Sequence, residues 1–190
     1  TAHIALAFPT PKYTDEKTSL FNLFDYLLES ATSMNLQQAI RQKLGLTYNI
    51  GCYNIPFQET GILKISTTTE PEKIDLLLSS IFEEIKRFKE LPKKEFETLK
   101  KKYIRLIKKL DKMPIFLADR VATEEMFGYE EANKKNISEL EKITQEDVQE
   151  LAENQFKDYL AYIIKPEWSF EEYLLKEKKD KKRKKEKKDK

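Results

Sequence analysis

The chain opens on a short pattern in which bulky and small residues alternate. In HIALAFP, residues 3–9, this alternation is typical of a strand with one bulky face and one small face. Similar alternation recurs at 46–52 and 61–67, and the connecting IPFQETG segment predicts a turn between antiparallel strands. A further apolar run at 159–166 predicts a last strand.

Apolar residues at helical spacing account for most of the remaining chain. They predict helices near 20–28, 34–43, 74–88, 92–110, 114–128 and 137–156. Thr69 with Glu72, and Thr144 with Asp147, have the spacing of helix-capping pairs. The order is strand, two helices, two strands, several helices and a strand. It predicts an α+β domain in two layers rather than a doubly wound sheet.

Length and charge divide the chain into a body and a tail. We expect one domain over 1–169, ending near a short helix at 168–175, and a helical or disordered Lys-rich tail over 170–190. The net charge of +2 conceals a last segment of fifteen residues with 11 basic and 4 acidic side chains, so the remainder is acidic. That segment has no aromatic residue for stacking on bases. We therefore interpret it as a solvated extension rather than a nucleic-acid-binding arm.

Several classes of chemistry are excluded by residue counts. His3 and Cys52 are the only histidine and cysteine, so the segment can form neither a disulfide framework nor a histidine-dependent zinc site. A nucleophilic triad would depend on the same single histidine. No stretch is long and apolar enough to cross a bilayer. Because the chain begins without Met on an apolar run, we expect a fragment or one domain of a longer protein.

The stretch RQKLGLTY, residues 41–48, is the best candidate for a site. Gly45 is suited to end a helix by taking a positive φ, with Leu46 packing back. Arg41 would then lie in the last helical turn and Tyr48 early in the next strand, so both side chains can reach one point beyond the sheet rim. A guanidinium and a phenol there could bind a carbonyl oxygen or a carboxylate.

A structural interpretation of the same pair stays open. Arg41 can simply complement the negative end of the helix dipole. Tyr48 shares its alternation with Leu46, Ile50 and Cys52, so it can equally be a core residue.

The chain also resembles a known family. AHIALAFPTP, then LQQAIRQKLGLTYNIGCYNIPFQETGILKISTTTEPEKIDLLLSSIFEEIKRF, then ELEKITQEDVQELAENQF are similar to the pitrilysin, insulinase and mitochondrial processing peptidase group of zinc peptidases. The similarity is to their second, non-zinc domain and runs from about residue 2 to about residue 166. The Arg, Leu-Gly, Tyr segment is its most specific part.

The resemblance implies a fold and a function. It implies a two-layer α/β domain whose mixed, mostly antiparallel sheet is covered by helices on one face. It also implies a peptide substrate, and a homologous domain, on this chain or another subunit, that holds the catalytic zinc. Arg41 and Tyr48 match the family residues that bind substrate carbonyls or the oxyanion. The segment alone should therefore be inactive.

Two departures keep an alternative open. Where the family often has glycines and Ser-Arg-Leu, this chain reads ESATSMNL at residues 29–36, and Gln42 replaces a frequent Glu. These changes are compatible with a non-catalytic structural or scaffold relative of the same fold.

Overall fold

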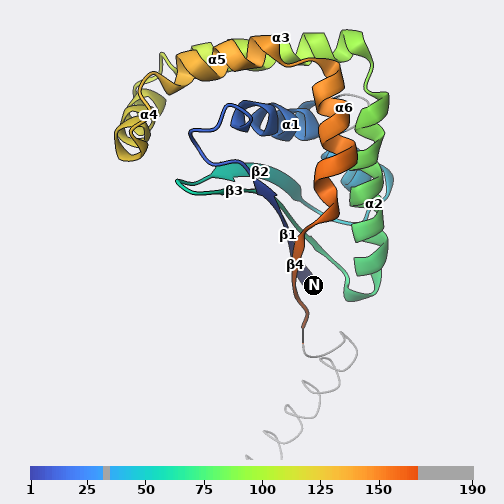
Figure 1. Ribbon diagram of the computed structural model, residues 1–190. Coiled ribbons are helices and arrows are strands. Elements are labelled where there is room, and N and C mark those ends of the chain that lie inside the picture. Colours follow the sequence, from blue (N-terminus) through green and yellow to red (C-terminus); the bar gives the residue numbers. More distant parts are fainter. Residues whose placement is uncertain (32–34, 167–190) are drawn as a thin grey trace, which may run out of the picture.

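Four antiparallel strands form one sheet in the computed structural model, which describes residues 1–31 and 35–166. Their spatial order is β2-β3-β1-β4 (Figure 1). Their bounds are β1 Ala2–Thr10, β2 Ile50–Pro56, β3 Gly61–Thr69 and β4 Leu160–Ile164. The strands β1 and β3 pair along their whole length, from Ala2 opposite Thr69 to Thr10 opposite Gly61.

Helices gather on one side of this sheet (Figure 1). The α-helices are α1 Thr18–Ser30, α2 Ile74–Arg87, α3 Lys93–Leu110, α4 Pro114–Phe127, α5 Ala132–Lys142 and α6 Gln145–Asn154. Shorter helical turns are η1 Gln37–Lys43, η2 Pro71–Lys73, η3 Phe88–Glu90 and η4 Gln155–Lys157. This is the two-layer α+β architecture that the sequence predicts.

The core lies between the sheet and its helices. Alternate residues of β1, including Ile4, Leu6 and Phe8, are buried on the helix-covered face. The Phe8 ring packs edge-on against Phe156 at a centroid distance of 4.9 Å, and Phe156 stacks on Phe24 of α1 at 5.1 Å. Each such side chain, fully buried, contributes roughly 1.5 to 3 kcal/mol, so these contacts hold the two layers together.

The edge strand β2 is covered by carboxylates from α1. The backbone N–H of Asn54 donates to Asp25 Oδ2 at 3.1 Å, and that of Cys52 donates to Glu29 Oε1 at 3.2 Å. Asp25 and Glu29 are four residues apart, so both lie on the helix face that looks toward β2. The amides of an edge strand would otherwise be open to pairing with another strand, and here they are occupied.

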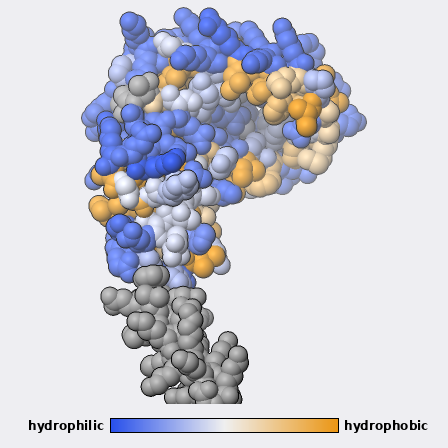
Figure 2. Space-filling model, turned by 180° about the vertical axis from the view of Figure 1, so that it is seen from behind, coloured by the Kyte–Doolittle hydropathy of each residue, from blue (hydrophilic) through white to orange (hydrophobic). Residues whose placement is uncertain are grey.

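Helix α4 projects from the rest of the fold at one end of the molecule (Figure 1). No residue of α4 is buried, and apolar side chains including Ile115, Val121 and Met126 are exposed along it. Figure 2 shows apolar residues gathered at this end when the molecule is viewed from behind. Within the described ranges, no helix combines the length and the apolar character needed to cross a membrane.

Three local expectations differ from the structure. β2 begins at Ile50 rather than residue 46, because Leu46–Asn49 forms a loop. Thr69 does not cap the helix that follows, since its hydroxyl donates to Leu46 O instead. The helix expected over 137–156 is divided between α5 and α6. The short helix expected at 168–175, the end of the expected domain and the tail lie outside the described residues.

Candidate functional site

The helix that carries Arg41 has an unusually wide turn. Over Gln37–Lys43 it is a π-helix, and the N–H of Leu44 donates to Ala39 O, five residues back, at 3.2 Å. Wide turns of this kind occur mostly as short segments, often near functional sites. Gly45 follows with φ of +60°, and the Leu46 N–H returns to Ile40 O at 3.1 Å. The helix therefore ends as the sequence predicts, with Leu46 buried against it.

The next four residues form the loop that carries Tyr48, which we call the 46–49 loop. Leu46 and Thr47 are buried, whereas Tyr48 and Asn49 are exposed. The loop is held by side-chain hydroxyls, and the regular ladder of β2 begins only after it, where Ile50 pairs with Thr67.

Arg41 and Tyr48 lie in contact. The guanidinium carbon of Arg41 is 4.9 Å from the centroid of the Tyr48 ring, a cation–π geometry. Arg41 is exposed, and Tyr48 is 82% exposed. In the part of the chain that the structure describes, Arg41 forms no ion pair. Both the forked guanidinium and the phenol lie at the surface of the described fold.

The core interpretation of Tyr48 is wrong. Leu46, Ile50 and Cys52 are buried as the alternation predicts, but Tyr48 turns outward because it precedes the strand. Arg41 does lie in the last turn of its helix, so it also complements the helix dipole. The structure thus brings together the two residues that the sequence singled out.

Other polar residues surround this pair that the sequence did not single out. Gln37 Nε2 donates to Asn49 Oδ1 at 3.4 Å across the exposed side of the loop. On the buried side, Thr67 and Thr69 of β3 donate to the loop from beneath. The sequence did contain a pattern that could have identified the threonines. Thr67 and Thr69 continue the alternation of Leu63 and Ile65 on the buried face of the strand, but they carry hydroxyls.

The described residues do not fit a metal ion. Across 1–31 and 35–166, no group of three or more His, Cys, Asp or Glu side chains converges in a way that could hold one. His3 is exposed on the open face of β1, whereas Cys52 is buried on the opposite, helix-covered face of the sheet. Burial raises the pKa of the Cys52 thiol, which disfavours the thiolate that zinc requires. A zinc ion would have to be held elsewhere.

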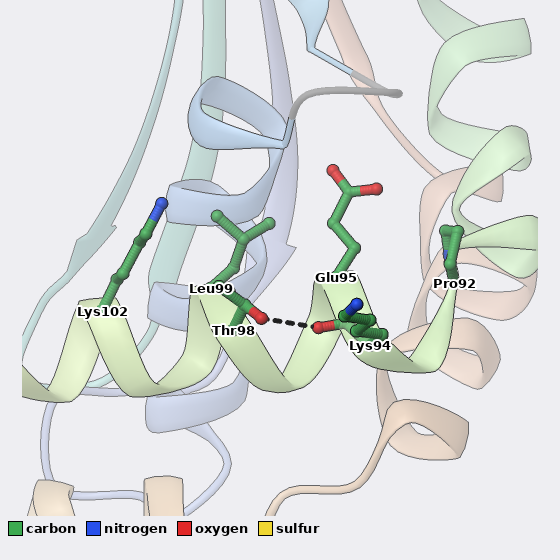
Figure 3. A pocket seen from close by; sticks show the side chains of 6 residues that line it. All are labelled: Pro92, Lys94, Glu95, Thr98, Leu99 and Lys102. Atoms are coloured by element: carbon green, nitrogen blue, oxygen red, sulfur yellow. Dashed lines mark hydrogen bonds between the residues drawn. The ribbon is translucent and has the colours of Figure 1, made fainter.

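The surface hollow at the start of α3 does not coincide with the Arg41–Tyr48 pair. It encloses about 350 Å³ and is lined by Pro92, Lys94, Glu95, Thr98, Leu99 and Lys102 (Figure 3). The hydroxyl of Thr98 donates to Lys94 O at 2.7 Å, so the helix backbone already uses it. With no activated nucleophile and no convergent donors, this hollow has the chemistry of an ordinary helix surface.

Comparison with known protein families identifies a match over the first half of the chain. The peptidase M16 inactive domain family matches residues 1–103, which include β1 to β3, Arg41 and Tyr48. An uncharacterized zinc protease from Rickettsia bellii is 34% identical over 93 residues, covering 48% of this chain. The matched segment spans 23% of the length of that relative. A second uncharacterized zinc protease, from Rickettsia felis, is 32% identical over 81 residues, 43% of this chain and 20% of that protein.

Solved structures share the fold. A protease from Helicobacter pylori superposes with a TM-score of 0.75 at 16% identity, covering 87% of this chain and 41% of that one. An inactive peptidase domain from Bordetella parapertussis gives a TM-score of 0.71 at 14% identity, covering 89% of this chain and 94% of that one. At such low identity the likeness shows the fold alone. The match covers less than half of the Helicobacter pylori protease and nearly all of the Bordetella parapertussis domain.

Proposed function

This chain belongs to the peptidase M16 inactive domain family, and from that premise we propose that it is the non-zinc half of a zinc metallopeptidase. In this proposal Arg41 and Tyr48 bind the substrate peptide in an active site completed by a zinc-bearing domain. That domain lies on the same polypeptide or on another subunit. The substrate is a peptide, and the reaction is hydrolysis of a peptide bond.

One observation carries the proposal: the Arg41 guanidinium, which forms no ion pair among the described residues, lies over the exposed ring of Tyr48 at the end of a helix. Tyr48 is 82% exposed, and within residues 1–31 and 35–166 its hydroxyl has no hydrogen-bond partner, so packing of the fold does not account for it. The Arg41 guanidinium, 4.9 Å from the ring centroid, restricts the orientation of the ring without using the hydroxyl. The pair is thus an ordered set of donors directed at solvent.

These donors suit a carbonyl that becomes an oxyanion. As water attacks a peptide carbonyl, negative charge develops on its oxygen, and fixed donors stabilise that charge more than the ground state. The Tyr48 hydroxyl can supply one hydrogen bond. The forked Arg41 guanidinium can supply one or two more, to the same oxygen or to a neighbouring substrate carbonyl. Zinc, when bound by the other domain, supplies Lewis-acid chemistry that this chain lacks.

The test is Tyr48→Phe in the complete peptidase with its zinc-bearing domain. We expect kcat/KM to fall by about 10²- to 10³-fold, the usual effect of removing one such donor, while zinc content stays unchanged. Arg41→Lys keeps the charge but removes the fork, and should also lower turnover.

A matched control exists on the open face of the sheet. Tyr53 of β2 is 52% exposed and lies beside a cation, with Lys64 Nζ 6.0 Å from its ring centroid. Tyr53→Phe removes a comparable hydroxyl away from the 46–49 loop, so turnover should be retained. Normal turnover in Tyr48→Phe would remove the pair from the reaction.

A non-catalytic scaffold is the second candidate. It is favoured by the segment at 29–36 and by Gln42, where the sequence departs from the usual pattern of the family. Under this alternative, Arg41 and Tyr48 substitutions leave peptide hydrolysis unchanged, whereas deletion of the whole domain affects the assembly of its partner.

A further inference from the structure

We propose that Thr67, assisted by Thr69, is a positioning residue for the peptidase reaction, because the two buried hydroxyls clamp the loop that presents Tyr48. The inference rests on the proposed function of the Arg41–Tyr48 pair. Neither threonine touches substrate in this proposal. They act through the backbone of the 46–49 loop.

The clamp is made of hydrogen bonds on both sides of Tyr48 in the sequence. Before Tyr48, the Thr69 hydroxyl donates to Leu46 O at 2.6 Å. After it, Asn49 O accepts from Thr47 Oγ1 at 2.9 Å and lies 3.0 Å from Thr67 Oγ1. The loop backbone is therefore held two residues before and one residue after Tyr48, whose side chain points into solvent.

The threonine hydroxyls form one consistent network. A hydroxyl donates one hydrogen and accepts two, so Thr67 can donate to Thr47 Oγ1 at 2.9 Å while Thr47 donates to Asn49 O. The Asn49 N–H then donates back to Thr47 Oγ1 at 3.2 Å. In this arrangement every polar group of the network has a partner, which is what gives buried hydrogen bonds a defined geometry.

The place of these hydroxyls in β3 indicates a role beyond packing. Thr67 is 6% exposed and Thr69 4% exposed, on the same face as Leu63 and Ile65. Valine would fill the same volume in a strand, and a buried hydroxyl is unfavourable unless it is bonded. The strand changes from aliphatic residues to threonine at the point where it passes beneath the 46–49 loop. The hydroxyls therefore serve the loop.

The same loop is tied to the helix that carries Arg41. The Leu46 N–H donates to Ile40 O at 3.1 Å, and the positive φ of Gly45 sets the direction of the chain between them. Arg41 and Tyr48 thus share one rigid support, anchored in the helix at one end and in β3 at the other. A misplacement of about 1 Å in such a group can lower a reaction rate about 10²-fold.

The experiment compares Thr67→Val and Thr67→Ser in the complete peptidase. Thr67→Val keeps the shape and removes the hydroxyl, so kcat/KM should fall about 10- to 100-fold with zinc content unchanged. Thr67→Ser restores the hydroxyl and should restore most of the rate. Thr68→Val is the matched control, because Thr68 lies on the opposite, open face of β3 and should leave kcat/KM unchanged.

Two readouts separate positioning from a general loss of structure. Hydrogen exchange at the Asn49 amide, which donates to Thr47 Oγ1, should accelerate in Thr67→Val and not in Thr67→Ser. In a Tyr48→Phe background, Thr67→Val should lower the rate little further, because the group that it positions is already absent. Purely structural damage would lower the rate by the same factor in both backgrounds, and that result would overturn the proposal.

The outcomes also distinguish this inference from the proposed function. If Tyr48→Phe lowers turnover and folded Thr67→Val does not, the clamp proposal fails while the role of Tyr48 stands. If Tyr48→Phe has no effect, the proposed function fails, and the positioning role fails with it even where exchange accelerates. If Thr67→Val does not fold, Thr69→Val decides, since it frees Leu46 O alone and should reproduce the loss of rate.

Discussion

Gly61 lies directly opposite Thr10 at the end of the β1–β3 pairing, and the close contact between the two strands leaves no room for a side chain at Gly61. A Cβ there would lie 2.4 Å from Thr10 Oγ1 and 2.5 Å from the carbonyl oxygen of Pro11. The second atom belongs to the backbone and cannot swing away. Glycine at this position is therefore a requirement of close packing rather than of backbone conformation.

Gly61→Ala should lower the free energy of unfolding by about 1 to 3 kcal/mol through overpacking. Urea denaturation measures the change. Gly51→Ala is the control, because the three atoms nearest to an added Cβ there all belong to the Tyr53 side chain, the hydroxyl oxygen at 2.8 Å, and that ring can rotate outward. Equal losses in the two variants would contradict this explanation.

Gly45→Ala should destabilise the domain for a different reason. Nothing lies within 4 Å of the added Cβ, but the φ of +60° disfavours every residue with a Cβ, at about 1 to 2 kcal/mol. Gly45→Asn should cost less, because asparagine adopts this conformation more readily. Thermal unfolding of both variants checks the order, and a less stable Asn variant would show that space, not φ, is limiting.

Asp25 should make stability depend on pH. Burial raises its pKa to about 6, and the charge of Glu29 acts in the same direction, while the hydrogen bond from Asn54 opposes them. Because the pKa is higher in the folded state than in the unfolded state, this group stabilises the fold at low pH. That contribution, up to about 3 kcal/mol, is lost as pH rises through about 6.

Asp25→Asn removes this titration and retains an oxygen to accept the Asn54 N–H. The variant should therefore gain stability relative to the parent protein between pH 4.5 and pH 7.5, measured by urea denaturation at each pH. Asp158→Asn, at an exposed position, is the control. A parallel pH profile for the Asp25 variant and the parent would show that Asp25 is not the group responsible.

Thr144→Ala should weaken the start of α6. The Thr144 hydroxyl accepts from the Asp147 N–H at 3.2 Å, and Asp147 Oδ2 accepts from the Thr144 N–H at 2.7 Å. Losing this capping box should cost about 1 kcal/mol in unfolding free energy. Thr98→Ala on α3 removes a threonine that bonds only within its helix, and should cost distinctly less.

Local patterns predicted most of the fold because their causes are local. The alternation of β1 reflects one face against helices and one face open, and the Thr144–Asp147 box needs only residues three apart. The Thr69–Glu72 box failed although its spacing is as good. The hydroxyl of Thr69 is taken by Leu46 O, twenty-three residues away in the chain, and no local pattern reports that competition.

The candidate site shows the same division. Arg41 and Tyr48 were found because they flank Gly45, whose helix-ending role is legible in the sequence. The outward turn of Tyr48 was one of two interpretations that the sequence left open, since Leu46, Tyr48, Ile50 and Cys52 keep the period of a strand. Long-range hydroxyl bonds from Thr67 and Thr69 hold this segment as a loop, so the periodicity continues where the ladder does not.

The carboxylates of Asp25 and Glu29 along β2 have a consequence for self-association. Fibre growth by strand addition needs an unpaired edge strand on both sides of every sheet. On one side, an incoming strand would first have to displace both charged groups from the Cys52 and Asn54 amides. Edge-to-edge addition of a copy along β2 is therefore disfavoured, because it would cost both of these hydrogen bonds.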